Sequence, residues 1–152
     1  MDFRKNTSYW ILISVSILLT FFLLIGQTYS LINYDSAVKH GLQESVEEIG
    51  NVGIAFAKGF AFGDTLIYIP LLIVGITGFL KKKKWGFFSL FGSLAISVYW
   101  PLVHLYAIFI ERDAINLASE KYISYPIVLS LIIIYGIWGM IYLYKNQKSL
   151  IS

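Results

Sequence analysis

The chain has 152 residues, of which 57% are hydrophobic and 14% charged, with a net charge of +3 and a mean hydropathy of +0.70. Soluble domains usually carry about 25% charged residues, so this composition is typical of a membrane protein. The chain has no cysteine and only two histidines, His40 and His104. This excludes disulfides and thiolate metal sites and argues against a histidine metal site, so we expect no metal and no cofactor.

Four apolar segments are long enough to cross a bilayer, which takes about 20 residues. The first is too long for a signal peptide and lacks a cleavage site, so we interpret it as a retained span. The second ends at Leu80, and counting back about 20 residues places its start near Phe60. The chain is therefore expected to form one membrane domain over residues 1–152, an all-α bundle of four transmembrane helices. The expected spans are residues 9–32, 60–80, 85–110 and 122–144.

The lysines and arginines predict the orientation of these spans. Most of them fall on one side of the expected membrane, which the positive-inside rule places in the cytosol together with both termini. The lysine run between the second and third spans is interpreted as a stop-transfer signal that lies among anionic head groups, and not as a nucleic-acid site. The residues on this side are Arg4, Lys5, Lys81, Lys82, Lys83, Lys84, Lys145 and Lys148.

Residues 36–59 form an amphipathic segment on the outer side. Its apolar residues recur at helical spacing, and Asp35 is a candidate cap for the start of such a helix. The segment is either a helix on the membrane surface or an outward extension of the second span. The apolar positions are Val38, Leu42, Val46, Ile49, Gly53 and Phe56.

Three spans carry polar residues at helical spacing, which places each set on one face of its helix. Such faces avoid lipid, so we expect them to turn toward the bundle interior. Small polar residues also serve ordinary packing between membrane helices, and this reading stays open for the serines. The sets are Ser16, Thr20, Gln27, Ser30 and Tyr34; Asp64 and Tyr68; and Ser89, Ser93, Ser97, Trp100, His104 and Glu111.

The polar residues whose burial in lipid costs the most free energy lie at a similar depth. At about 1.5 Å per residue, Gln27, Asp64 and His104 lie roughly 24 to 28 Å from the cytosolic edge of their spans. Tyr125 lies at a similar height in the fourth span. This predicts a cavity in the outer half of the bundle. A carboxylate at this depth is usually functional, although Asp64 as an interfacial cap and His104 as a structural residue remain alternatives.

The segment 60–70, FAFGDTLIYIP, resembles the second span of the EXPERA family, which includes emopamil-binding sterol isomerases and sigma-two-type receptors. Asp64, Tyr68 and Pro70 carry the likeness, and Ile110 to Asp113 resembles the acidic end of the family's third span. The likeness is clearest over residues 60–113. The segment departs from the family in two ways. It has Asp64 where the family usually has Glu, and it lacks the histidine that the family's isomerases use just before that acid.

The resemblance implies an intramembrane pocket for a sterol-like or amphipathic small molecule. Asp64 and Glu111 would be the candidate acid and base of isomerase-like chemistry. We expect a ligand-binding membrane protein whose other partners are the lipid bilayer and a second copy or a larger membrane complex. A structural subunit of a complex and a small transporter are the alternative functions. The expected ligand-binding residues are Gln27, Asp64, Tyr68, Trp100, His104 and Tyr125.

Overall fold

The structure is a computed structural model that describes residues 6–110 and 112–150. Four of its helices are long and apolar enough to cross a membrane, namely Thr7–Ile32, Val46–Leu80, Lys84–Phe109 and Lys121–Lys148. Over these described ranges the chain contains no strand. The predicted all-helical architecture with four candidate membrane helices is thereby confirmed, and it is compatible with a multi-pass integral membrane protein.

Two of the long helices contain a π-helical segment. The elements, in chain order, are α1 (Thr7–Leu23), π-helical η2 (Leu24–Thr28), α2 (Tyr29–Ile32), α3 (Tyr34–Lys39), α4 (Val46–Gly63), π-helical η3 (Asp64–Tyr68), α5 (Ile69–Leu80), α6 (Lys84–Phe109), the short 3-10 helix η4 (Arg112–Ala114) and α7 (Lys121–Leu150).

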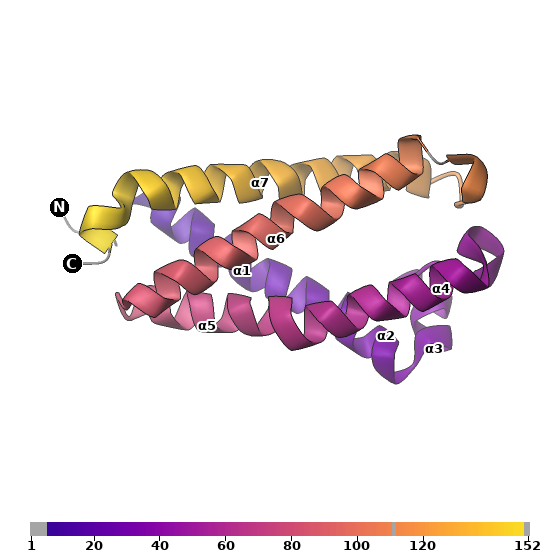
Figure 1. Cartoon of the computed structure of the whole chain (residues 1–152), viewed down its shortest axis with the longest axis horizontal. Coiled ribbons are helices and arrows are strands. Elements are labelled where there is room, and N and C mark those ends of the chain that lie inside the picture. The colour runs from indigo at the N-terminus through magenta and orange to yellow at the C-terminus, as the bar shows by residue number, and fades with distance from the viewer. Residues whose placement is uncertain (1–5, 111, 151–152) are drawn as a thin grey trace.

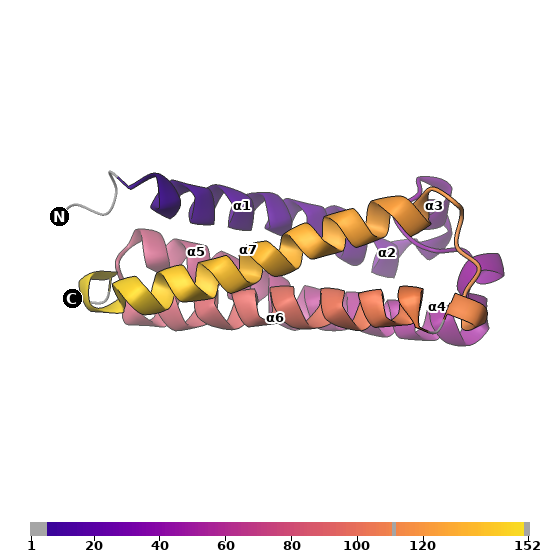
Figure 2. The same ribbon diagram turned by 90° about the horizontal axis from the view of Figure 1, so that it is seen from above.

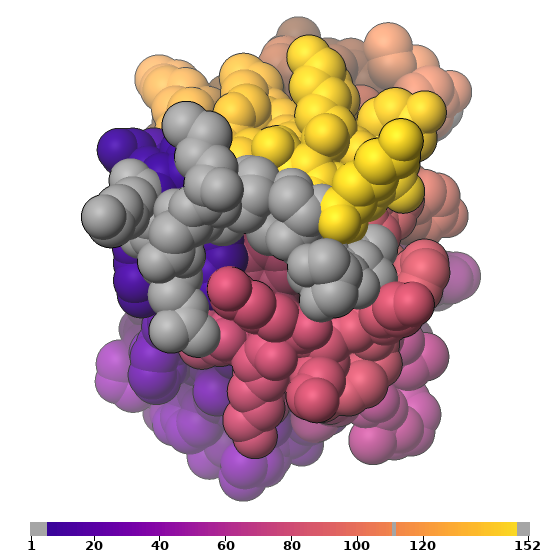
Figure 3. Space-filling view, turned by 90° about the vertical axis from the view of Figure 1, so that its left-hand side faces the viewer, coloured from indigo at the N-terminus to yellow at the C-terminus, as the bar shows by residue number. Residues whose placement is uncertain are grey.

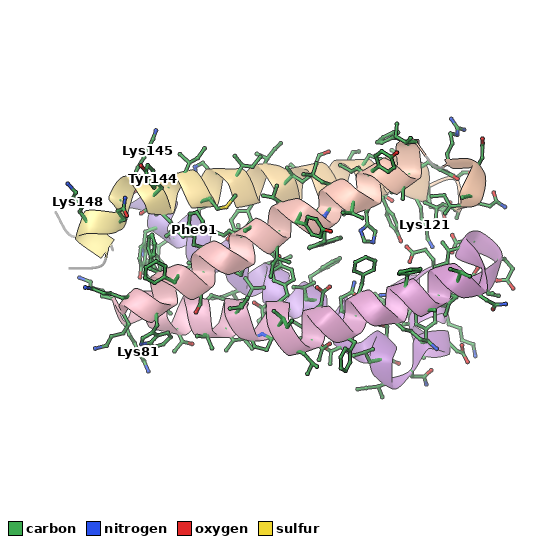
Figure 4. All side chains as sticks on the ribbon, viewed as in Figure 1. Lys81, Phe91, Lys121, Tyr144, Lys145 and Lys148 are labelled. Atoms are coloured by element: carbon green, nitrogen blue, oxygen red, sulfur yellow. The ribbon has the colours of Figure 1, made fainter. Side chains whose placement is uncertain are left out.

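The helices form an elongated bundle with two different ends (Figures 1 and 2). The start of α1, the turn from α5 to α6 and the end of α7 lie together at what we call the terminal end, which Figure 3 shows face on. Lys81, Lys145 and Lys148 lie at this end, whereas Lys121 lies at the opposite end, called here the loop end (Figure 4). Most cations of the described chain therefore share one end of the bundle.

Small residues hold the helices close near the terminal end. The turn after α5 brings α6 back so tightly that a Cβ on Gly86 would overlap the backbone of Gly78 and Phe79. Large apolar residues fill the rest of this half, and Leu12, Leu90 and Leu143 are completely buried there. Dispersion contacts of this kind are the main force between helices that already lie in lipid.

The second helix begins at Val46, well before the predicted start at Phe60. Ser45 and Glu48 form a capping box, in which each side chain bonds the other residue's backbone N–H. This arrangement satisfies amides that the first turn leaves without partners. Gly50, with a non-helical φ of 66°, kinks this helix near its start, and residues 51–59 continue into the second span. They extend the span outward, which is the second of the two readings that the sequence left open.

The amphipathic segment 36–59 does not form a single helix but is divided between α3 and α4. Gly41 adopts a positive φ of 69°, which ends the short helix α3 and turns the chain back toward the bundle. Glycine reaches this conformation at no steric cost. The predicted cap is wrong too, because the Asn33 side chain, and not that of Asp35, accepts from the amide of Ser36.

Glu48 joins α4 to the loop between α6 and α7. Its Oε2 atom lies 2.8 Å from the Nζ atom of Lys121, its Oε1 atom accepts from the amide of Ala118 at 3.0 Å, and its carbonyl accepts from the amide of Asn116 at 2.8 Å. The ion pair is only 14% exposed on each side. These contacts join the start of α4 to the loop between α6 and α7 at the loop end.

We expect Glu48→Ala to destabilise the protein by about 2–3 kcal/mol, because it removes charge-assisted bonds and leaves Lys121 without its carboxylate. Glu47→Ala is the matched control, since Glu47 is exposed on the same helical turn. Unfolding by increasing the fraction of a denaturing detergent in mixed micelles measures both. Equal losses of stability for the two variants would show that the contacts of the Glu48 side chain do not stabilise the protein.

Candidate functional site

A cavity of about 340 Å³ lies in the half of the bundle nearest the loop end. Its walls come from all four long helices and from the turn after α3. The wall is mostly apolar, with a few polar side chains, which is the usual composition of a small-molecule site. The lining residues are Phe22, Ile25, Gly26, Gln27, Gly41, Leu42, Gln43, Glu44, Ala57, Phe60, Asp64, Trp100, His104, Ser124, Tyr125, Val128, Leu129 and Ile132.

The structure brings together most of the residues selected from the sequence. Gln27, Asp64, Trp100, His104 and Tyr125 come from four different helices and line this single cavity.

Tyr68 and Glu111 do not join that group. Tyr68 is 1% exposed within the packed floor beneath the cavity, and its hydroxyl bonds the hydroxyl of Ser97. Since Ser97 already donates its own proton to the carbonyl of Ser93, the Tyr68 hydroxyl is the donor in this pair. Tyr68 therefore supports the floor. Glu111 lies outside the described residues.

The two π-helical segments lie side by side and carry the key polar residues into the wall. Segment η2 contains Gln27, and η3 begins at Asp64. The hydroxyls of Thr28 and Thr65 join the two segments at 3.0 Å. In η3 the bulge has a local cause, because Pro70 has no N–H to give to the preceding turn and its ring would crowd that turn's carbonyl. Pro70 therefore accounts for the π-bulge beside the cavity.

Asp64 is half-buried in the wall. Among the described residues, no hydrogen bond or ion pair joins its carboxylate to another side chain or to the backbone. It begins a π-helical segment inside one continuous helix, so the reading of Asp64 as the cap that starts the second span is wrong. A carboxylate in such surroundings gains free energy from a ligand that supplies a hydrogen-bond donor or a positive charge.

Aromatic rings cover the side of the cavity between α4 and α6. The imidazole of His104 lies 5.6 Å from the ring of Phe60 and 5.2 Å from that of Trp100, measured between centroids. Its Nδ1 atom lies 2.9 Å from the carbonyl of Trp100 and must donate there, which leaves Nε2 as the acceptor of the neutral ring. The Trp100 N–H is buried beside the Tyr68 hydroxyl without reaching hydrogen-bond geometry.

Two residues that the sequence analysis did not select, Gln43 and Glu44, close the cavity toward the loop end. The Gln43 amide donates at 3.0 Å to the carbonyl of Gly26, in the π-helical segment η2. The Glu44 Oε1 atom accepts from the hydroxyl of Tyr125 at 2.6 Å. The sequence showed only polar residues in a surface segment. Their role depends on the turn at Gly41, which folds them inward.

Tyr34 supports this turn from outside the membrane helices. Burial, together with the negative charges of Glu44 and Glu48, raises the pKa of its hydroxyl to about 12. The hydroxyl therefore keeps its proton at neutral pH and donates to the carbonyl of Glu44 at 3.1 Å. Because this proton is needed for the bond, the support is expected to be lost only in strongly alkaline solution.

Most members of the predicted polar faces do turn inward, as expected. Ser16, Ser30, Ser93 and Ser97 are each at most 1% exposed. They lie in packed contacts outside the cavity; Ser16, for example, bonds the hydroxyl of Tyr135 at 2.6 Å. For these four serines, the structure agrees with the reading as packing between helices.

The chain was compared with protein-family models, curated proteins and solved structures, and it matches none of them. The resemblance to the EXPERA family therefore rests on the short motifs around Asp64 and stays a prediction.

Proposed function

We propose that this protein binds a hydrophobic or amphipathic small molecule inside the membrane, with Asp64 as the central polar contact. The observation that carries the proposal is the cavity itself. It brings Asp64 together with Gln27, Trp100, His104 and Tyr125, and its wall is mainly apolar. A carboxylate without an internal partner in such a wall favours a ligand that is apolar over most of its surface and polar at one point.

The charged residues of the cavity wall further restrict which classes of ligand can bind. Among the described residues that line it, Asp64 and Glu44 are the acidic ones, and none is a lysine or arginine. Binding an anionic group there would place like charges together in a poorly solvated site, which is strongly unfavourable. A sterol-like or isoprenoid alcohol, or an amphipathic amine, fits the wall by this criterion.

Binding is proposed ahead of isomerase-like turnover. General acid and base catalysis needs two groups placed on either side of the reacting atoms. The candidate partner Glu111 lies outside the described residues, whereas Glu44 lines the cavity with its carboxylate already bonded to Tyr125.

A structural subunit of a membrane complex would need no such cavity, and a small transporter would need access from both ends. The described cavity lies only toward the loop end.

Thermal unfolding of the purified protein in mild detergent tests the proposal. Sterols, isoprenoid alcohols and amphipathic amines are added singly, and a ligand of the folded state raises the melting temperature. Stearate serves as the anionic control, for which we expect no shift. If no compound of the three classes stabilises the protein, the binding proposal fails, and the search turns to protein partners.

We also propose that the terminal end faces the cytosol, which follows from the cations gathered there. Because the chain has no cysteine, single cysteines can test this. In sealed vesicles with the cytosolic face outward, Lys82→Cys should react with a membrane-impermeant maleimide. Glu47→Cys, exposed near the loop end, should react only after detergent is added. The reverse pattern would contradict the proposed orientation.

A further inference from the structure

The hydroxyl groups of the cavity wall have already given their protons to partners within the protein. The Tyr125 hydroxyl donates to the carboxylate of Glu44 at 2.6 Å. The Ser124 hydroxyl donates to the carbonyl of Glu120 at 2.9 Å. Because a hydroxyl carries a single proton, neither residue has a donor left for a ligand, although both can still accept a hydrogen bond.

The two nitrogen-bearing rings of the wall also keep their N–H groups from the cavity. The His104 Nδ1–H group donates to the carbonyl of Trp100, and the Trp100 N–H group lies buried beside the hydroxyl of Tyr68. Among the described side chains that line the cavity, the amides of Gln27 and Gln43 are the ones that still have an N–H group to give.

The acceptors of the wall, by contrast, are left without donors. Among the described residues, no hydrogen bond or ion pair reaches the carboxylate of Asp64, and none reaches the Nε2 atom of His104. An acceptor that is taken out of water without a donor loses free energy on every binding event. The wall therefore favours a ligand whose polar end donates more hydrogen bonds than it accepts.

The contacts between the second and third long helices show how far apart these two acceptors lie. The ring of Phe60 lies against that of His104, and the hydroxyl of Tyr68 bonds Ser97. Asp64 is four residues from both Phe60 and Tyr68, so it lies between these two contacts. It is therefore about one helical turn, roughly 6 Å along the bundle, from the level of His104.

From these observations we infer that the polar end of the ligand carries two hydrogen-bond donors on neighbouring atoms, one for Asp64 and one for the Nε2 atom of His104. A long-chain vicinal diol or amino alcohol has this arrangement. Its two donors are about 3 Å apart and each hydrogen bond adds up to about 2.8 Å, so one such group can span the two acceptors. This inference rests on the proposed function, and it makes His104 a residue that determines specificity.

Amphiphiles whose polar end only accepts hydrogen bonds are excluded by the same argument. A ketone, ether or ester would leave both Asp64 and His104 unpaired in the occupied cavity. Sites that are built to bond a hydroxyl or amino group discriminate strongly against analogues that lack it, because the buried groups of the site then have no partner.

A series of compounds with one hydrocarbon chain tests the number of donors. Octadecyl methyl ether has no donor, octadecanol has one and the vicinal octadecanediol has two, and none of them is charged. Each is titrated against the purified wild-type protein in mild detergent, and the concentration that gives half of the maximal rise in melting temperature is measured. We expect the diol to act at concentrations about two- to tenfold lower than the alcohol, and the ether to be about tenfold or more weaker than the alcohol.

His104→Phe tests the assignment of the second donor. The variant keeps an aromatic ring beside Phe60 and Trp100 and removes the Nε2 acceptor. The alcohol should still stabilise it, whereas the advantage of the diol over the alcohol should fall to less than about twofold. Tyr106→Phe is the matched control, because Tyr106 is exposed on the same helix and lies outside the cavity wall, and it should keep the full advantage of the diol.

The outcomes separate this inference from the binding proposal. Equal action of the ether and the alcohol, or a diol no better than the alcohol, would overturn the inference in the wild-type protein alone and leave binding intact. A diol advantage that survives in His104→Phe would overturn the role of His104. If none of the three compounds stabilises the wild type, the inference is wrong, and the binding proposal then stands only if a compound of its own panel raises the melting temperature.

Discussion

Asp64→Asn is expected to remove at least about half of the ligand-dependent stabilisation. The substitution keeps the shape of the side chain and removes its charge. The binding free energy should therefore fall by the contribution of one charge-assisted hydrogen bond in a poorly solvated wall, about 1.5–3 kcal/mol. That corresponds to an affinity loss of roughly ten- to a hundredfold. With ligand at about 100 Kd the wild type gains about 2.7 kcal/mol, and after a hundredfold loss the gain falls to about 0.4 kcal/mol.

The measurement is the melting temperature with and without the ligand that stabilises the wild type best. Glu47→Gln is the matched control, because it removes one carboxylate from an exposed position of the same long helix, outside the cavity wall. It should respond to ligand as the wild type does. A full ligand response in Asp64→Asn would show that the ligand does not use this carboxylate.

Gly86→Ala is expected to produce the largest loss of stability among single methyl additions. The added Cβ would overlap backbone atoms of Gly78 and Phe79, which cannot move aside as a flexible side chain can. The helices α5 and α6 would have to separate, at a cost of about 1–3 kcal/mol or more. The gain of up to about 1 kcal/mol in helix propensity offsets only part of this cost.

Gly92→Ala is the control, since it lies on the same helix and a Cβ there would meet nothing within 4 Å. This variant should be neutral or slightly stabilised. Unfolding in mixed micelles measures both variants, and their effects should have opposite signs or differ by at least about 1 kcal/mol. Equal effects would show that α5 and α6 do not depend on close contact at this point.

The membrane architecture could be predicted because hydrophobicity and length act along the chain. Each apolar segment has to be about 20 residues long to cross a bilayer, and it has to satisfy its own backbone, so only a helix serves. The charged residues at Lys81–Lys84 and at Lys145 mark where apolar surface ends. These constraints are local, and the first, third and fourth helices begin within two residues of their predicted starts.

The inward-facing residues could also be recognised, because burying a polar group in lipid is costly at any position. That argument selected Gln27, Asp64 and His104, and their similar depth followed from helix rise alone. It could not separate Tyr68 from them. Tyr68 lies one turn from Asp64, but it belongs to the packed floor, where its hydroxyl bonds Ser97 on another helix.

What only the tertiary structure decided is how the cavity is closed. Gly41 turns the chain back, so that Gln43 bonds the carbonyl of Gly26 and Glu44 bonds Tyr125, a residue 81 positions away. The sequence cannot show such contacts, because they depend on how far α1, α4 and α7 diverge. Sequence alone therefore determined four apolar helices with a polar face near one end. The second carboxylate of the wall and the closure of the cavity toward the loop end arose from long-range packing.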